Sequence, residues 1–138
     1  PRPAPAWSRA TFAILAGGFA VCLVVQVLLA GLAVFADPRY WTHHVRFVRV
    51  FELLPLAMAA TALAGRSPRH LAWQSAGLVG LVFLMYFTAN MRTVAPVVAA
   101  FHPVLAVVLV LAATQVARQA WGLITPPDAG PGALKAVD

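Results

Sequence analysis

Four long apolar runs, separated by short polar connections, dominate the pattern of hydrophobic and polar positions along this chain. A helix needs about 20 residues to cross the roughly 30 Å hydrocarbon core of a bilayer, and each run is long enough. The pattern predicts helices over about 8–36, 39–64, 68–90 and 96–122. Four spans with short connections favour an all-α membrane protein, an up-down-up-down bundle of four transmembrane helices.

Prolines and glycines mark where these helices stop, restart or bend. Pro38 follows an aspartate and separates the first two runs. Pro55 lies inside the second run, where it removes a backbone hydrogen bond, so we expect a kink between Phe51 and Pro55. After a single transmembrane domain over 1–125, the prolines and glycines of 126–138 predict a flexible tail.

Composition supports a membrane protein and argues against nucleic acid as a partner. The 138 residues are 62% hydrophobic and 10% charged, against about 25% charged in a soluble domain. The net charge of +6 comes from basic residues that flank the apolar runs, as at helix ends that face lipid headgroups. The first run is too long for a signal-peptide core, and Cys22 within it predicts a packing residue. The chain does not begin with methionine, so we expect it to be trimmed or processed.

The distribution of basic residues predicts the orientation in a bacterial inner membrane. Four lie on the side opposite to the N-terminus, and the positive-inside rule therefore places both termini in the cytoplasm. The six on the N-terminal side are Arg2, Arg9, Arg66, Arg69, Arg118 and Lys135; the other four are Arg39, Arg46, Arg49 and Arg92.

Two histidines occupy matching positions in the second and fourth spans. His44 follows Pro38 by six residues, and His102 follows Pro96 by six. With a rise of about 1.5 Å per residue, both should lie about 9 Å into helices that run in the same direction. Imidazoles on diagonal helices of a bundle can ligate one haem iron from its two faces. Two histidines are too few for a closed tetrahedral zinc site.

A structural role is the alternative for this pair, because a histidine in a span is often a hydrogen-bonded packing residue; another ligand also stays open. His43 lies about 100° around the helix from His44, and His70 belongs to the opposite end of the bundle. Both are predicted to be interfacial residues.

Other polar side chains at membrane depth are further candidates, since ionisable groups there usually mark function or pairing. Arg46, Arg49 and Arg92 could hold haem propionates or extend to lipid headgroups. Glu52 lies three residues after Arg49, which favours a pair along one helix face, with proton handling or a quinone contact as the functional alternative. Gln26 is expected to form an interhelical hydrogen bond, with a ligand contact as the alternative.

Three segments carry a family resemblance: Gln26-Val-Leu-Leu-Ala-Gly-Leu-Ala-Val-Phe35, then His44, then Phe101-His-Pro-Val104. Over about residues 20–115 the chain resembles small bacterial four-helix membrane proteins, which in turn resemble one half of haem A synthase, a cytochrome b-like four-helix unit. The resemblance implies that His44 and His102 ligate haem b. It does not extend to the enzyme's catalytic carboxylates, so no enzymatic activity is implied.

Three functions remain open at this point. The chain could be a haem-carrying electron-transfer subunit, associated with other subunits of a membrane redox complex. It could be a non-catalytic accessory subunit of a larger assembly. It could also be a small dimeric transporter that uses Glu52 as its coupling carboxylate. An enzyme is less favoured than these, because no nucleophile–base pair or complete metal site is visible.

Overall fold

The computed structural model describes residues 4–125, and all of its regular structure is helical in that range. The helices are α1 (Ala6–Phe35), α2 (Tyr40–Phe51), α3 (Leu54–Ala64), α4 (Arg69–Asn90), α5 (Pro96–Ala99) and α6 (His102–Gly122). They form four membrane-length apolar segments, which confirms the predicted fold class. The tail predicted over 126–138 lies outside the described residues.

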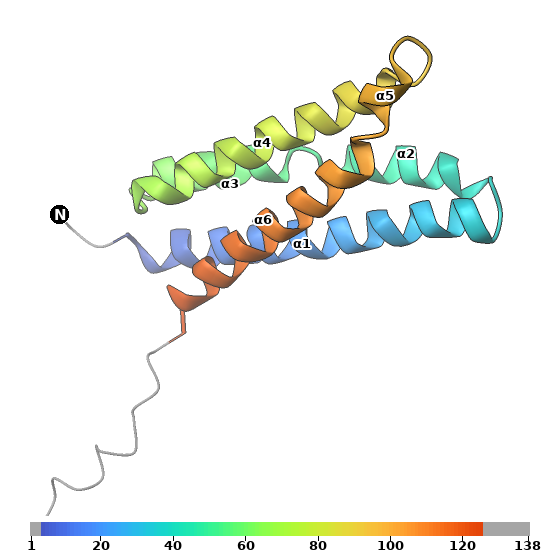
Figure 1. The fold of residues 1–138 in the computed structure, drawn as a ribbon. Coiled ribbons are helices and arrows are strands. Elements are labelled where there is room, and N and C mark those ends of the chain that lie inside the picture. Colours follow the sequence, from blue (N-terminus) through green and yellow to red (C-terminus); the bar gives the residue numbers. More distant parts are fainter. Residues whose placement is uncertain (1–3, 126–138) are drawn as a thin grey trace, which may run out of the picture.

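The segments run alternately up and down, so that the chain returns to its starting end (Figure 1). There, the Arg9 guanidinium near the start of α1 donates a hydrogen bond to the Leu123 carbonyl just after α6, at 3.3 Å. α1 packs against α2, α3 and α6, and α4 packs against α3 and α6. The second and fourth spans are therefore diagonal to each other, as predicted for the spans that carry His44 and His102.

The second span breaks where Pro55 predicts a kink. α2 ends at Phe51, Glu52 and Leu53 form a turn, and α3 begins at Leu54. Because proline has no backbone N–H, the Phe51 carbonyl loses its usual helical donor. The prediction of a kink between Phe51 and Pro55 is confirmed.

The fourth span also breaks, which the predicted continuous helix over 96–122 did not include. α5 ends at Ala99, and α6 begins only at His102. Pro103 causes the same loss here, since it cannot donate to the Ala99 carbonyl. His102 is therefore the first residue of a new helix. Its depth in the membrane cannot be calculated from a continuous helical rise that starts at Pro96, so that prediction was wrong for this span.

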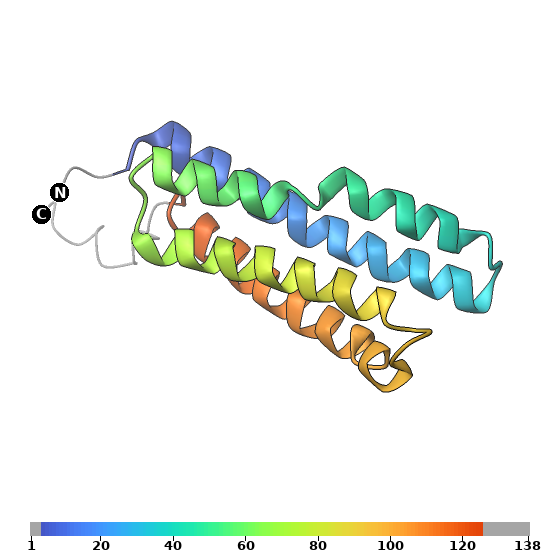
Figure 2. The same cartoon turned by 90° about the horizontal axis from the view of Figure 1, so that it is seen from above.

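Packing is unequal along the bundle. The core forms near the end where α1 begins, around the buried side chains of Phe12, Phe19, Met58, Leu71 and Leu78. At the other end, only Ala33 is buried within residues 24–50, and only Thr88 within residues 79–108. We call these two ranges the open half. Figure 2 shows the α1–α2 pair separating from α4, α5 and α6 toward this end.

The outer surface of the bundle is apolar. Large hydrophobic side chains project outward from every span, among them Phe35, Val50, Trp73 and Leu111, which are 66–90% exposed. In water such a surface would drive association, whereas in a bilayer it meets lipid chains. Together with the length of the spans, it identifies a multi-pass membrane protein.

An ion pair orders the connection between α1 and α2. The Arg39 guanidinium donates to the Asp37 carboxylate at 2.8 Å, and the Arg39 backbone N–H donates to its other oxygen at 2.8 Å. These bonds hold the pKa of the Asp37 carboxyl below its usual value. Because Asp37 is paired with Arg39, its carboxylate is not available to the other arginines at this end of the bundle.

Candidate functional site

His44 is tied to α1 by a reciprocal pair of hydrogen bonds. Its Nδ1 lies 3.1 Å from the Gln26 backbone carbonyl, and the Gln26 side-chain amide donates to the His44 carbonyl at 2.9 Å. The Trp41 ring, one turn earlier on α2, meets the imidazole edge-on with centroids 5.5 Å apart. Two contacts therefore hold the half-buried ring and a third holds its backbone, and the interhelical bond predicted for Gln26 is confirmed.

His102 is tied to α4 in a similar way. Its Nδ1 lies 3.0 Å from the Met85 backbone carbonyl and 3.2 Å from the Thr88 hydroxyl oxygen. Thr88 directs its own hydroxyl proton to the carbonyls of Leu84 and Met85, at 2.9 and 3.1 Å. The hydroxyl oxygen can therefore accept from the imidazole, and it shares the Nδ1 proton with Met85.

These bonds settle the tautomer of both rings. A backbone carbonyl can only accept, so the Nδ1 atom beside it must carry the proton. In a neutral imidazole, Nε2 then keeps its lone pair and is the atom left for a ligand. Metal-binding histidines in proteins are usually oriented through such a bond from the non-ligating nitrogen.

The two imidazoles form a pair between diagonal spans. His44 lies in the second span and His102 in the fourth, and both belong to the same half of the bundle. Both belong to the open half, where few side chains from the protein fill the interior. Within residues 4–125, no three His, Cys, Asp or Glu side chains gather in one place, so this site offers two nitrogen donors and no third ligand of those types.

Glu52 has a different partner from the predicted one. Its carboxylate accepts a short hydrogen bond from the Tyr86 hydroxyl on α4, and no ion pair with Arg49 forms. Glu52 keeps a helical backbone conformation, and its N–H donates to the Val48 carbonyl, but its carboxylate bonds across to α4 instead of along α2 to Arg49. The Glu52–Tyr86 bond joins the second and third spans at the base of the open half.

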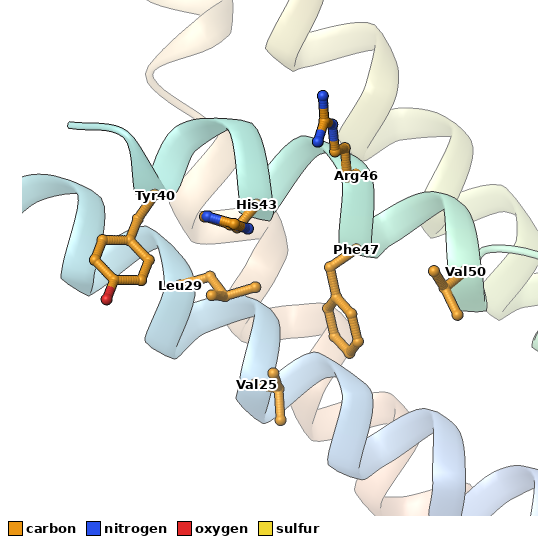
Figure 3. Close-up of a pocket in the computed structure, with 7 residues that line it drawn as sticks. All are labelled: Val25, Leu29, Tyr40, His43, Arg46, Phe47 and Val50. Atoms are coloured by element: carbon orange, nitrogen blue, oxygen red, sulfur yellow. The ribbon is translucent and has the colours of Figure 1, made fainter. Parts of the chain in front are cut away.

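The predicted arginines and the other two histidines lie apart from the imidazole pair. Arg49 is exposed on α2, three residues before Glu52. Arg46 lines a groove beside α1 together with His43 (Figure 3). Arg92 is exposed in the turn after α4, and His70 is exposed in the first turn of that helix.

Three functional neighbours were not predicted: Trp41 beside His44, Tyr86 beside Glu52 and Thr88 beside His102. A signal for Thr88 was present in the hairpin geometry. In an antiparallel pair of helices, a residue before the connection can face a residue that follows it. Gln26 precedes His44 by 18 residues and Thr88 precedes His102 by 14. A polar residue on the preceding span, Gln26 for His44 and Thr88 for His102, therefore indicated a hydrogen-bond partner for each histidine.

Comparison with known proteins places the chain in a family without assigning a role. Residues 26–94 match the family of unknown function DUF6220. The match includes Gln26, His44, Glu52 and Thr88, and it ends before His102. No curated protein and no solved structure matches the chain. Since the match covers half of its 138 residues, the chain belongs to the DUF6220 family.

Proposed function

We propose that this protein binds one b-type haem between His44 and His102 and carries electrons within the membrane. One observation carries the proposal. Two imidazoles on diagonal spans each donate Nδ1–H to a backbone carbonyl of the neighbouring helix, which leaves both Nε2 atoms as donors. A packing role needs only the Nδ1 bonds and does not explain why both diagonal spans carry a ring oriented in this way in the same half of the bundle.

The chain's own residues supply the ligands and their orientation. Gln26 and Trp41 would hold the His44 ring while iron binds, and Met85 and Thr88 would hold the His102 ring. The weak packing of the open half supports the proposal, because a macrocycle would supply the apolar contacts that the protein lacks there. Bound haem would provide reversible one-electron chemistry.

The propionates need cationic partners near the outer end of the bundle. Arg49 and Arg92 remain candidates, since both are exposed at this end and neither forms an ion pair within residues 4–125. Arg46 is a weaker candidate because it lines the groove with His43. Bidentate hydrogen bonds between guanidinium and carboxylate would be the favoured geometry.

Visible absorption of the purified protein tests the proposal directly. After expression with haem available, we expect a Soret band and a low-spin spectrum that changes reversibly on reduction with dithionite. The pyridine haemochrome assay should give about one haem per chain, as two axial ligands allow. A protein without a Soret band, even after haem is added, would refute haem binding and favour an accessory subunit with a hydrogen-bonded histidine pair.

We further propose a bacterial inner-membrane location with both termini in the cytoplasm. The support is the six-to-four distribution of basic residues and the even number of membrane-length segments. In a Cys22→Ala background, Arg92→Cys should react with a membrane-impermeant maleimide in intact cells. Thr125→Cys should react only after the membrane is opened. The opposite pattern would reverse the orientation, and labelling of both from outside would contradict the four-span topology.

In this orientation the haem would lie toward the outer face of the membrane. Other subunits of a membrane redox complex would then supply or accept its electrons. The dimeric transporter is less favoured, because Glu52 is engaged by Tyr86 within one chain. A coupling carboxylate has to release its proton and bind substrate in turn, and this bond would have to break in each cycle.

A further inference from the structure

A groove of about 650 Å³ lies along α1 and α2, apart from the histidine pair. Its outer end is polar, with Tyr40, His43 and Arg46, and its floor is apolar, with Val25, Leu29 and Phe47. Figure 3 shows Tyr40, His43 and Phe47 along the side of α2 that lies beside Val25 and Leu29 of α1, whereas the Arg46 side chain projects from α2 away from α1, at the rim of the groove. Spacings of three and four residues place these α2 side chains on one face.

The polar end of the groove carries a cation without a protein partner. Arg46 is exposed and forms no ion pair or hydrogen bond within residues 4–125. The two acidic residues of that range are both engaged, Asp37 by Arg39 and Glu52 by Tyr86. Arg46 lies six residues into α2, about 9 Å along its axis, at a depth where an unpaired guanidinium is unfavourable. An anion from outside the protein would remove that cost.

The remaining lining fits a molecule with an anionic head and an apolar chain. The His43 and Tyr40 rings contact each other with centroids 5.7 Å apart, beside Arg46, and offer further hydrogen-bonding groups for a phosphate. Below them, Val25, Leu29 and Phe47 offer only apolar surface. The groove is formed by two membrane-length segments and is lined in part by exposed residues, so its occupant can come from the bilayer.

We propose that this groove binds an anionic phospholipid, with its phosphate at Arg46 and His43 and an acyl chain along Val25, Leu29 and Phe47. A zwitterionic phospholipid carries the same phosphate, but its ammonium group would face the neighbouring cations Arg46 and Arg49. The site should therefore prefer a net negative headgroup. This inference does not depend on haem binding.

Native mass spectrometry of the full chain, released from detergent with added lipid, measures this preference. The probes are phosphatidylglycerol and phosphatidylcholine with identical acyl chains. Wild-type protein should retain phosphatidylglycerol preferentially. An arginine near a membrane surface contributes about 1 kcal/mol of attraction to anionic lipid, so Arg46→Gln should reduce the preference about fivefold. The matched control is Arg69→Gln, an exposed arginine at the opposite end of the bundle, which should leave it unchanged.

A second pair of variants tests the acyl-chain half of the site. Leu29→Trp fills the groove and should lower phosphatidylglycerol retention, whereas Val24→Trp should not, because Val24 is exposed on α1 but does not line the groove. Helical circular dichroism confirms that each variant is folded. Equal retention of the two lipids by wild type, an unchanged preference in Arg46→Gln, an equal loss in Arg69→Gln, or an ineffective Leu29→Trp would each overturn the proposal.

Discussion

Replacing His102 with alanine is expected to abolish the low-spin haem spectrum, and replacing His44 should do the same. Each ring supplies one of the two nitrogen donors that the site offers, so loss of either leaves at most one axial ligand. A five-coordinate, high-spin haem or no haem should remain. Both variants should still insert four spans, because the histidine bonds connect helices that also pack through their apolar faces. Absorption spectra of oxidised and reduced protein give the result.

Two controls separate loss of a ligand from loss of the fold. His70→Ala removes an exposed imidazole at the opposite end of the bundle and should keep the wild-type spectrum. In His102→Gly, added imidazole should restore the low-spin bands, since the small ligand can enter the space vacated by the side chain. A low-spin spectrum that survives in either alanine variant would contradict the assignment of the axial ligands.

Replacing Gly65 with alanine is expected to destabilise the fold by about 1–3 kcal/mol, the usual cost of overpacking. Gly65 is buried after α3, and an added Cβ would overlap Ser8 at the start of α1 and come within 3.1 Å of the Thr61 carbonyl. The Gly65 backbone has a φ of −82°, which alanine adopts easily. The cost is therefore steric. Denaturant unfolding in mixed micelles, followed by circular dichroism, measures it.

Gly18→Ala is the matched control, because its added Cβ meets nothing within 4 Å. Alanine is favoured over glycine inside a helix by about 1 kcal/mol, so this variant should be neutral or stabilising. Ser8→Gly should rescue Gly65→Ala, since it removes the side chain that the new methyl group meets. Additive effects of the two substitutions would show that the contact between the loop and α1 is not responsible.

The fold was largely predictable because bilayer thickness sets the length of each span and prolines interrupt helices in a known way. The four spans and the break at Pro55 follow from those two rules. The break at Pro103 follows from the same rule but was not predicted, because the matching spacings from Pro38 to His44 and from Pro96 to His102 suggested two equivalent continuous helices. The separation of the open half has no comparable signal, because it reflects how whole helices cross each other.

The site was predictable only in part. His44 and His102 stand out as polar residues in apolar spans, and their diagonal placement follows from the topology. Their hydrogen-bond partners include the backbone carbonyls of Gln26 and Met85, groups that every residue has and that no sequence pattern marks. Glu52 shows a second limit. Its partner Tyr86 is 34 residues away, so the pairing depends on tertiary packing, whereas Arg49 was suggested by local spacing alone.

The bonds to the two histidines each stay within a pair of consecutive spans. Gln26 and His44 belong to the first hairpin, and Met85, Thr88 and His102 belong to the second. During biosynthesis, each hairpin can therefore leave the translocon with these polar groups already paired, which avoids exposing them to lipid. The two histidines do not have to wait for the other hairpin, whereas the bond between Glu52 and Tyr86 forms only when the two hairpins meet. When the two hairpins meet, His44 and His102 come into one bundle, so the competence to bind a cofactor would arise as the last step of assembly.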